Sequence, residues 1–167
     1  MILCGLCVLG AMRDISVRVA TSRDADFVLA LVPQLAAFGP PPWRTEQQMI
    51  ETDTRVISRA LQGLSPGATI LIAEDSGGKP LGFAHVCVEA DYYTRRGCRH
   101  IADLVISPEA RGCGVGERLI TASEEWARAQ GYSLFTLNVF LENTQARSLY
   151  ERTGFSAEIV RYVKQLR

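Results

Sequence analysis

The segment that most constrains the fold is Leu104–Gly116, where an apolar strand runs into a glycine-rich turn and a helix begins. Ile101–Ile106 is almost continuously apolar, which predicts a strand buried inside a sheet. Gly112, Gly114 and Gly116 follow, and glycines let a backbone approach a ligand without Cβ collisions. The helix start adds unpaired N–H groups and a partial positive charge. The segment therefore predicts a seat for an anion, most often phosphate or pyrophosphate.

Two well-known phosphate-binding motifs do not fit this segment. A P-loop needs a Lys-Ser or Lys-Thr pair after the glycines, and neither pair is present. The dinucleotide fingerprint has the spacing G-x-G-x-x-G, whereas Gly112, Gly114 and Gly116 are spaced G-x-G-x-G. That fingerprint also opens a βαβ unit, whereas several predicted strands precede this turn. On these residues alone, a turn that only caps a helix stays open as the alternative.

Hydrophobic periodicity predicts the other elements, and Pro33 is expected to kink or end the first helix. The expected strands are Ile15–Ala20, Ala68–Glu74, Leu81–Glu89, Ile101–Ile106, Leu134–Phe140 and one or two more between Phe155 and Leu166. One helix is expected after the caps Thr21–Asp24 and a second after the capping box Thr45-x-x-Gln48. Two more helices are expected over Val115–Gln130 and Thr144–Arg152. The order β-α-α-β-β-β-α-β-α-β predicts one α/β domain with a central mixed sheet flanked by helices, neither doubly wound nor all-β.

Size and charge restrict the class of protein. The 167 residues suit one domain, and 18 basic against 18 acidic residues give a formal net charge of zero. This balance indicates no nucleic-acid partner. The apolar run Met1–Met12 is shorter than the ~20 residues that span a bilayer, and it lacks the positive start of a secretory signal. We expect no membrane partner, an extension over residues 1–12 and a domain over 13–167. Packing of the extension on a partner subunit is the alternative.

The five cysteines predict reduced thiols. Their number is odd and their spacing is irregular. Cys4-x-x-Cys7 resembles half of a zinc or redox motif, but no second cysteine or histidine pair completes a tetrahedral site. We therefore expect no metal and a reducing, cytoplasmic location.

Two motifs carry a family resemblance. Arg111-Gly112-Cys113-Gly114-Val115-Gly116 matches the R/Q-x-x-G-x-G/A signature of the GNAT superfamily of acetyl-CoA-dependent N-acetyltransferases. Asn143–Phe155 resembles that superfamily's N-x-x-A-x-x-L-Y-x-x-x-G-F segment, with one helix and one strand between the motifs. The resemblance implies the GNAT fold and direct transfer of an acetyl group from acetyl-CoA to a primary amine of a small molecule, peptide or protein. It also implies a homodimer, an assembly common in the family.

The resemblance places the cofactor between two strands that splay apart, those of Leu104–Ile106 and Leu137–Val139. The pyrophosphate is expected at the amides of Gly112–Gly116. The implied cofactor-binding residues are Leu104, Val105, Ile106, Arg111, Gly112, Cys113, Gly114, Val115, Gly116, Asn143 and Tyr150. Arg118 and Arg147 are candidate helpers at the phosphates, although a solvated helix face is the better explanation of both.

The resemblance also implies catalytic roles. Tyr150 matches the family's general acid, which protonates the departing CoA thiolate, and a phenol with a pKa of ~10 suits that role. The amine must lose a proton, and the candidate bases are Asp103, His100 and Glu89, unless a water chain replaces them. Asp103 is favoured, because a polar residue in an apolar central strand needs a reason. His100 titrates in the right range, but a surface histidine is the alternative. His85, inside an apolar strand, is expected to be structural.

Aromatic side chains mark the expected acceptor site. In the family the loop between the first two helices contributes to that site, and here the loop carries Phe38 and Trp43, while Tyr92 and Tyr93 are expected on the other side. Aromatic faces suit an apolar amine or a cation–π contact, with plain packing under the proline-rich loop as the alternative. No dense acidic cluster marks a polyamine or aminoglycoside site. A non-catalytic acetyl-CoA-binding regulatory module, and an acyltransferase that uses a longer acyl-CoA, both stay open.

Overall fold

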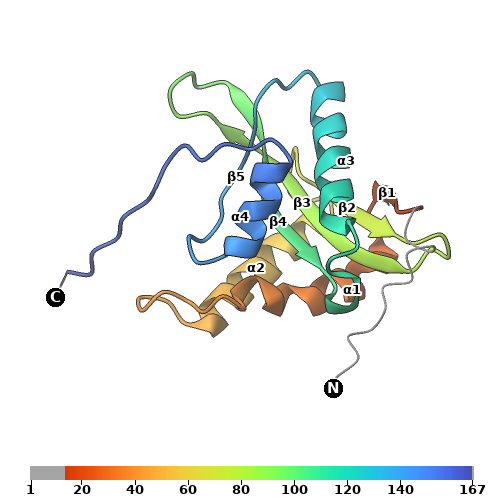
Figure 1. Cartoon of the computed structure of the whole chain (residues 1–167), viewed down its shortest axis with the longest axis horizontal. Coiled ribbons are helices and arrows are strands. Elements are labelled where there is room, and N and C mark those ends of the chain that lie inside the picture. Colours follow the sequence, from red (N-terminus) through yellow and green to blue (C-terminus); the bar gives the residue numbers. More distant parts are fainter. Residues whose placement is uncertain (1–13, 167) are drawn as a thin grey trace.

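The computed structural model of the chain describes residues 14–166, a five-stranded sheet with helices on both faces (Figure 1). The strands are β1 (Ser16–Val19), β2 (Thr69–Glu74), β3 (Pro80–Ala90), β4 (Gly97–Ile106) and β5 (Phe135–Leu137). The helices are α1 (Ala25–Leu31), α2 (Glu46–Leu61), α3 (Val115–Ala129) and α4 (Thr144–Arg152), with 3-10 turns η1 (Ser22–Asp24), η2 (Val32–Ala36) and η3 (Pro108–Ala110). The predicted mixed α/β class is confirmed.

The apolar extension expected over residues 1–12, with Cys4 and Cys7, lies outside the described part of the chain. Within residues 14–166, no helix is long and apolar enough to cross a membrane. The same range holds no group of three or more histidine, cysteine, aspartate or glutamate side chains that could bind a metal ion.

The strands lie in the order β1-β2-β3-β4-β5, which makes the sheet mixed, as predicted. β1 to β4 form an antiparallel meander, and β5 joins β4 in parallel. The β4–β5 pairing covers only Arg99–Ile101 against Phe135–Leu137. β4 therefore runs on past its parallel neighbour.

Each face of the sheet carries its own apolar core. Phe83 of β3 and Val105 of β4 pack on the face covered by α1 and α2. Val86 and Ile101 of the same two strands pack on the other face, against α3 and α4. Side chains alternate along a strand, so Leu104, next to Val105, packs on the opposite face, and the two central strands supply both cores. Figure 1 shows the two helix pairs on opposite sides of the sheet.

Local sequence signals explain where α1 ends and α2 begins. Oγ1 of Thr45 accepts a hydrogen bond from the N–H of Gln48 at 3.2 Å, and Oε1 of Gln48 accepts one from the N–H of Thr45 at 2.9 Å. This is the predicted capping box, and α2 follows it. Pro33 lies in η2, directly after α1, as expected for a residue that has no N–H to continue a helix.

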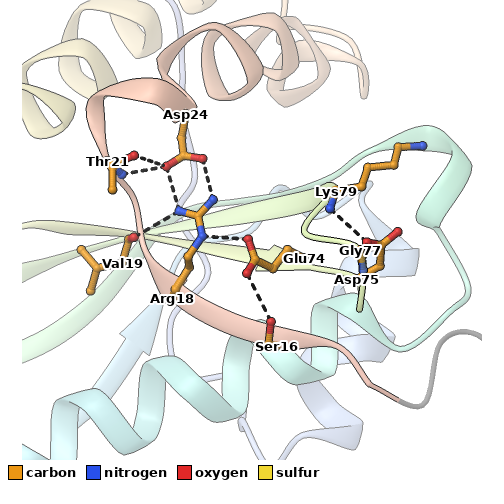
Figure 2. A network of polar contacts seen from close by, with 9 residues as sticks. All are labelled: Ser16, Arg18, Val19, Thr21, Asp24, Glu74, Asp75, Gly77 and Lys79. Atoms are coloured by element: carbon orange, nitrogen blue, oxygen red, sulfur yellow. Dashed lines mark hydrogen bonds and ion pairs between the residues drawn. The ribbon is translucent and has the colours of Figure 1, made fainter.

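Arg18 ties β1 to the rest of the fold (Figure 2). Its guanidinium forms ion pairs with Asp24 of η1 at 2.8 Å and with Glu74 of β2 at 2.7 Å. Asp24 is buried and also accepts hydrogen bonds from the backbone N–H and the hydroxyl of Thr21. The Arg18 guanidinium holds the pKa of Asp24 well below its usual range. The network thus fixes a short edge strand against β2 and α1.

The C-terminal prediction requires a correction. The final strands expected between Phe155 and Leu166 are not formed, and β5 is shorter than the expected Leu134–Phe140. Residues 156–166 run away from the sheet without regular structure (Figure 1). Tyr162 in this tail is 90% exposed. An alternating apolar pattern predicts extended backbone, but a strand also needs a neighbour for its N–H and C=O groups. Phe155 itself stays on the domain, with its ring centroid 5.7 Å from that of Phe135.

Candidate active site

A cleft opens where β5 leaves β4. The parallel pairing ends at Ile101 and Leu137, whereas β4 continues to Ile106. Beyond Ile101, no strand among residues 14–166 pairs with this edge of β4, so its backbone groups are available to a ligand. The space measures about 1240 Å³ and is lined by β4, η2, α2, the start of α3 and α4.

β4 carries a bulge at this cleft. Asp103 lies opposite His85 and Ile101 lies opposite Val86, which leaves Ala102 as the extra residue. A bulge increases the local twist of a strand and changes the direction of its side chains. Ala102 is exposed, although it lies inside the strand, and it lines the cleft together with Asp103.

The start of α3 presents backbone groups to the cleft. Gly112 and Gly114 have φ angles of +76° and +82°, in the left-handed region that favours glycine. Gly114 is the N-cap of α3 and has no side chain to accept a hydrogen bond, so the first-turn N–H groups have no side-chain cap among the described residues. A Cβ at either glycine would meet nothing within 4 Å. This open helix start suits an anion.

Gly116 has a packing role instead. It is buried, and a Cβ there would lie 2.8 Å from Cδ2 of Leu149 and 3.0 Å from Cδ1 of Ile106. It therefore allows α3 to pack closely on α4 and β4. Cys113 does not line the cleft, and its Sγ lies 3.6 Å from the backbone oxygen of Arg111. The other predicted cofactor-binding residues all line the cleft: Leu104, Val105, Ile106, Arg111, Gly112, Gly114, Val115, Gly116, Asn143 and Tyr150.

Two arginines bring positive charge to the helix start. Arg111 lines the cleft and donates to Oε1 of Gln34 in η2. Arg152 of α4 also lines the cleft, and its guanidinium lies 3.3 Å from the carboxylate of Glu117 in the first turn of α3. The sequence reasoning missed Arg152.

The two arginines that the sequence suggested as helpers point elsewhere. Arg118 donates to the backbone oxygen of Ile15 at 3.3 Å, and Arg147 donates to that of Leu141 at 3.4 Å. Neither lines the cleft. Helical spacing distinguishes Arg152 from Arg147. Arg152 is four residues after Ser148 and so lies on the same face of α4, and Ser148 also lines the cleft.

Tyr150 of α4 faces the same space. It lines the cleft, and its ring packs edge-on against Phe155 at 5.9 Å between centroids. No described residue forms a hydrogen bond with its hydroxyl. Burial, together with the charge of Asp103, raises the pKa of Tyr150 to about 12, so the phenol keeps its proton at neutral pH. Asn143 caps α4, as predicted, with its Oδ1 accepting from the N–H of Ala146 at 3.0 Å.

Among the candidate bases, Asp103 is the one that lines the cleft. Its Oδ2 lies 2.9 Å from Nδ1 of His85, which is buried on β3. His100 is buried on β4, in place of the surface position considered from the sequence, and its Nδ1 lies 2.9 Å from Oγ1 of Thr136. Burial lowers the pKa of His100. Glu89 lies 3.5 Å from that ring, and neither His100 nor Glu89 lines the cleft.

The four aromatic residues are not gathered into one pocket. Phe38 lines the cleft, whereas Trp43, Tyr92 and Tyr93 do not. Tyr92 and Tyr93 are each 76% exposed and pack edge-on against each other at 5.1 Å in the β3–β4 hairpin. The structure therefore places one predicted acceptor residue at the cleft and three outside it.

The cleft also contains an acidic residue that the sequence reasoning missed. Asp53 of α2 is half-buried and lines the cleft. Burial, together with the charge of Asp103, raises the pKa of Asp53 to about 6. The apolar stripe identified α2 as a helix, but a stripe on one helix does not reveal which strand lies opposite its polar positions.

Comparisons with known proteins agree with this geometry. A sequence model described as the Acetyltransferase (GNAT) family matches residues 33–155, most of the chain. The chain belongs to the GNAT family. This GNAT chain is 30% identical to glucosamine 6-phosphate N-acetyltransferase 1 of Oryza sativa subsp. japonica over 140 residues, which are 83% of the chain and 80% of that protein.

Another relative of this GNAT chain is the uncharacterized N-acetyltransferase YhfO of Bacillus subtilis (strain 168). The two are 33% identical over 91 residues, which are 54% of this chain and 60% of that protein. The chain thus matches somewhat more than half the length of YhfO, and it matches 28% of a mycothiol acetyltransferase of Pseudarthrobacter chlorophenolicus (strain ATCC 700700 / DSM 12829 / CIP 107037 / JCM 12360 / KCTC 9906 / NCIMB 13794 / A6).

Solved structures show the same fold. A putative acetyl transferase from Pyrococcus furiosus has a TM-score of 0.73 at 20% identity, over 92% of this chain and 100% of that one. The aminoglycoside N-acetyltransferase AAC(6')-Iy, in complex with CoA, has a TM-score of 0.67 at 21% identity, over 92% of this chain and 96% of that one. At these identities the likeness establishes the GNAT fold alone.

Proposed function

We propose that the chain transfers the acetyl group of acetyl-CoA directly to a primary amine of a small molecule, peptide or protein. One observation carries this proposal: a single cleft joins an open helix start, the phenol of Tyr150 and the carboxylate of Asp103. The helix start suits the phosphates of a donor. The phenol and the carboxylate are a proton donor and a proton acceptor, the two groups that amine acylation needs.

The lining of the cleft fits acetyl-CoA, which would supply an activated thioester. The open N-terminus of α3, with Arg111 and Arg152 beside it, complements the negative phosphates of the donor. The unpaired edge of β4 after Ile101 offers N–H and C=O groups to the amides of the pantetheine arm. Backbone N–H groups fixed near the developing oxyanion contribute about 3–4 kcal/mol in other acyl transfers.

Asp103 and Tyr150 then divide the proton transfers. Asp103 accepts a proton from the acceptor ammonium, and His85 orients its carboxylate. The nitrogen lone pair forms the new C–N bond as the C–S bond breaks. Tyr150 donates its phenolic proton to the departing thiolate, and its raised pKa keeps that proton in place until then. The acylated nitrogen then loses its second proton to the resulting tyrosinate, which restores the phenol.

Features of the acceptor end support an amine substrate without naming it. Phe38 supplies an aromatic face beside the cleft. The rice relative is a glucosamine 6-phosphate N-acetyltransferase, and a Klebsiella aerogenes relative is an aminoglycoside N(6')-acetyltransferase. Two alternatives are tested in the experiment below. A non-catalytic regulatory module would show no turnover, and an acyltransferase for longer acyl-CoA donors would prefer a longer donor.

We further propose that residues 13–167 form the transferase domain, that the chain is a homodimer and that it is cytoplasmic. The outer edge of β5 and the exposed apolar tail over residues 156–166 support the dimer, because a strand edge and an extended segment complete each other between two copies. Cys87 and Cys98 form no disulfide among the described residues, which supports a reducing compartment.

The experiment that tests the transferase function is thiol release from acetyl-CoA with a panel of amines. The panel holds amino acids, lysine peptides, alkylamines, polyamines and aminoglycosides, and the products are weighed by mass spectrometry. We expect an acetylated product with at least one class. Binding of acetyl-CoA with no product from any amine would favour the regulatory module, and faster release from a longer acyl-CoA would favour the other alternative.

A further inference from the structure

We propose that Asp53 binds a second positive charge on the acceptor, so that the substrate is an amine with two cationic groups. The inference rests on the proposed function, since it concerns the acceptor end of the same cleft. It assigns a chemical class to the substrate, namely diamines and other dibasic compounds. The aromatic residues of the sequence did not indicate this class.

Asp53 and Asp103 face one space from two elements. Gln48, Met49, Thr52 and Asp53 share one side of α2, and all four line the cleft. Asp103 lines the cleft from β4. The sequence separates the two carboxylates by 50 residues, and the fold brings them to the same cleft.

The carboxylate of Asp53 has no cation to neutralise it. Among residues 14–166 it has neither a hydrogen bond nor an ion pair, whereas Asp103 has His85 at 2.9 Å. The charge of Asp103 adds to burial in raising the pKa of Asp53 to about 6, and no arginine opposes that shift. Like charges in a partly desolvated cleft repel, and a bound cation relieves this repulsion.

The positions of Asp53, Asp103 and Tyr150 in the fold assign each carboxylate to one end of the acceptor. Asp103 lies on β4, inside the sheet. Asp53 lies on α2 and Tyr150 on α4, the helices that pack on opposite faces of that sheet. The reacting amine needs Asp103 and the side of the cleft that holds Tyr150. Asp53 is left for a cationic group farther from the transferred acetyl.

The test compares acceptors that differ by one charge. Thiol release from acetyl-CoA is measured with the diaminoalkanes from diaminopropane to diaminohexane, and with n-alkylamines of the same chain lengths. We expect kcat/KM for the best diamine to exceed that of its monoamine by about tenfold or more, the ratio that corresponds to ~1.4 kcal/mol of binding. Asp53→Asn removes this preference and leaves monoamine turnover in place, and Asp53→Glu retains part of it.

Glu51→Gln is the matched control. Glu51 lies on the same helix but outside the cleft lining, is exposed and accepts a hydrogen bond from Gln47. The control should keep the full preference for diamines. Equal rates for diamines and monoamines in the wild type would overturn the inference and leave the transferase function standing. Equal loss of both substrates in Asp53→Asn would also overturn it, because it would show a structural role.

A binding measurement covers the case in which no amine is acetylated. With CoA present, diaminohexane should raise the melting temperature of the wild type more than hexylamine does, and Asp53→Asn should abolish the difference. Such a result would keep the second cation site while the transferase function failed. The same shift with both amines, or with both proteins, would overturn the inference.

Discussion

Nδ1 of His85 lies 2.9 Å from Oδ2 of Asp103, so a buried imidazole on β3 holds the carboxylate that β4 presents to the cleft. The two residues are register partners at the bulge of β4. His85 is 3% exposed and does not line the cleft, which makes it a positioning residue for Asp103. The sequence predicted a structural role for His85, and this contact connects that role to the proposed base, Asp103.

Removing this contact should slow turnover without weakening donor binding. We expect His85→Leu to lower kcat by about 10-fold to 100-fold, the range that corresponds to losing a hydrogen bond to a charged group, worth ~1.5–3 kcal/mol. KM for acetyl-CoA should stay unchanged. His85→Asn keeps a donor near the position of Nδ1 and should restore most of kcat. Equal loss in both variants, or a change confined to KM, would contradict a positioning role.

The unpaired carboxylate of Asp53 should cost stability at neutral pH. Burial, with help from Asp103, raises its pKa from 3.8 to about 6, so the folded state holds this proton more tightly than the unfolded state does. Stability associated with the protonated form is present below the unfolded pKa and is lost as pH rises through about 6. We expect Asp53→Asn to raise the free energy of unfolding by about 1–2 kcal/mol at pH 7.5, allowing for partial solvation.

Urea unfolding of wild type and Asp53→Asn across this pH range measures the effect. The advantage of the variant should shrink toward zero at about pH 3, because Asp53 is then largely protonated in both states. Glu51→Gln serves as the control on the same helix and should follow the wild type. An advantage of equal size at both ends of the pH range would exclude the titration of Asp53 as its cause.

The Arg18–Asp24 pair should contribute to stability with the opposite pH dependence. Arg18 lowers the pKa of Asp24, so this contribution is present above the unfolded pKa of about 4 and is lost as pH falls through the lower folded value. We expect Asp24→Asn to lower the free energy of unfolding by about 2–3 kcal/mol at pH 7, with a smaller deficit below pH 4. Asp26→Asn, at an exposed neighbouring site, should change it little; similar losses in both variants would argue against the ion pair.

The C-terminal tail should control assembly if it pairs with the β5 edge of a second copy. Deleting residues 156–167 leaves Phe155 on the domain and should convert a dimer to a monomer in light scattering coupled to size exclusion. Replacing Ile159 and Val160, both exposed, with serine is the milder variant and should weaken the dimer. A wild-type monomer, or a dimer that survives the deletion, would contradict the proposed pairing.

Local signals predicted the elements and the backbone half of the site. The capping box at Thr45, the stop at Pro33 and the cap at Asn143 each depend on contacts a few residues apart, and all three are confirmed. Gly112 and Gly114 also indicated the turn before α3, where the backbone adopts the left-handed conformation that favours glycine. Helix ends and turns of this kind depend on residues that are close together in the sequence, so the sequence alone predicts them.

Long-range pairings could not be read in the same way. His85 lies opposite Asp103 because of the register of two strands, and one bulge changes which side chains meet there. Asp53 faces the cleft because of where α2 packs on the sheet. The apolar stripe of α2 predicts a helix but not its position in the fold. The tail alternates like a strand, but the sequence does not say which edge would pair with it. Tyr92 and Tyr93 were expected at the acceptor site, whereas the hairpin carries them outside the cleft.

The most direct test is the turnover of Tyr150→Phe in the thiol-release assay. The substitution removes only the hydroxyl, which no described residue hydrogen-bonds, and keeps the ring against Phe155. We expect kcat to fall by about 100-fold or more with KM for acetyl-CoA unchanged, as for the loss of a general acid. Tyr162→Phe, in the exposed tail, should match the wild type. A Tyr150→Phe variant with wild-type kcat would contradict the assignment of this phenol as the proton donor.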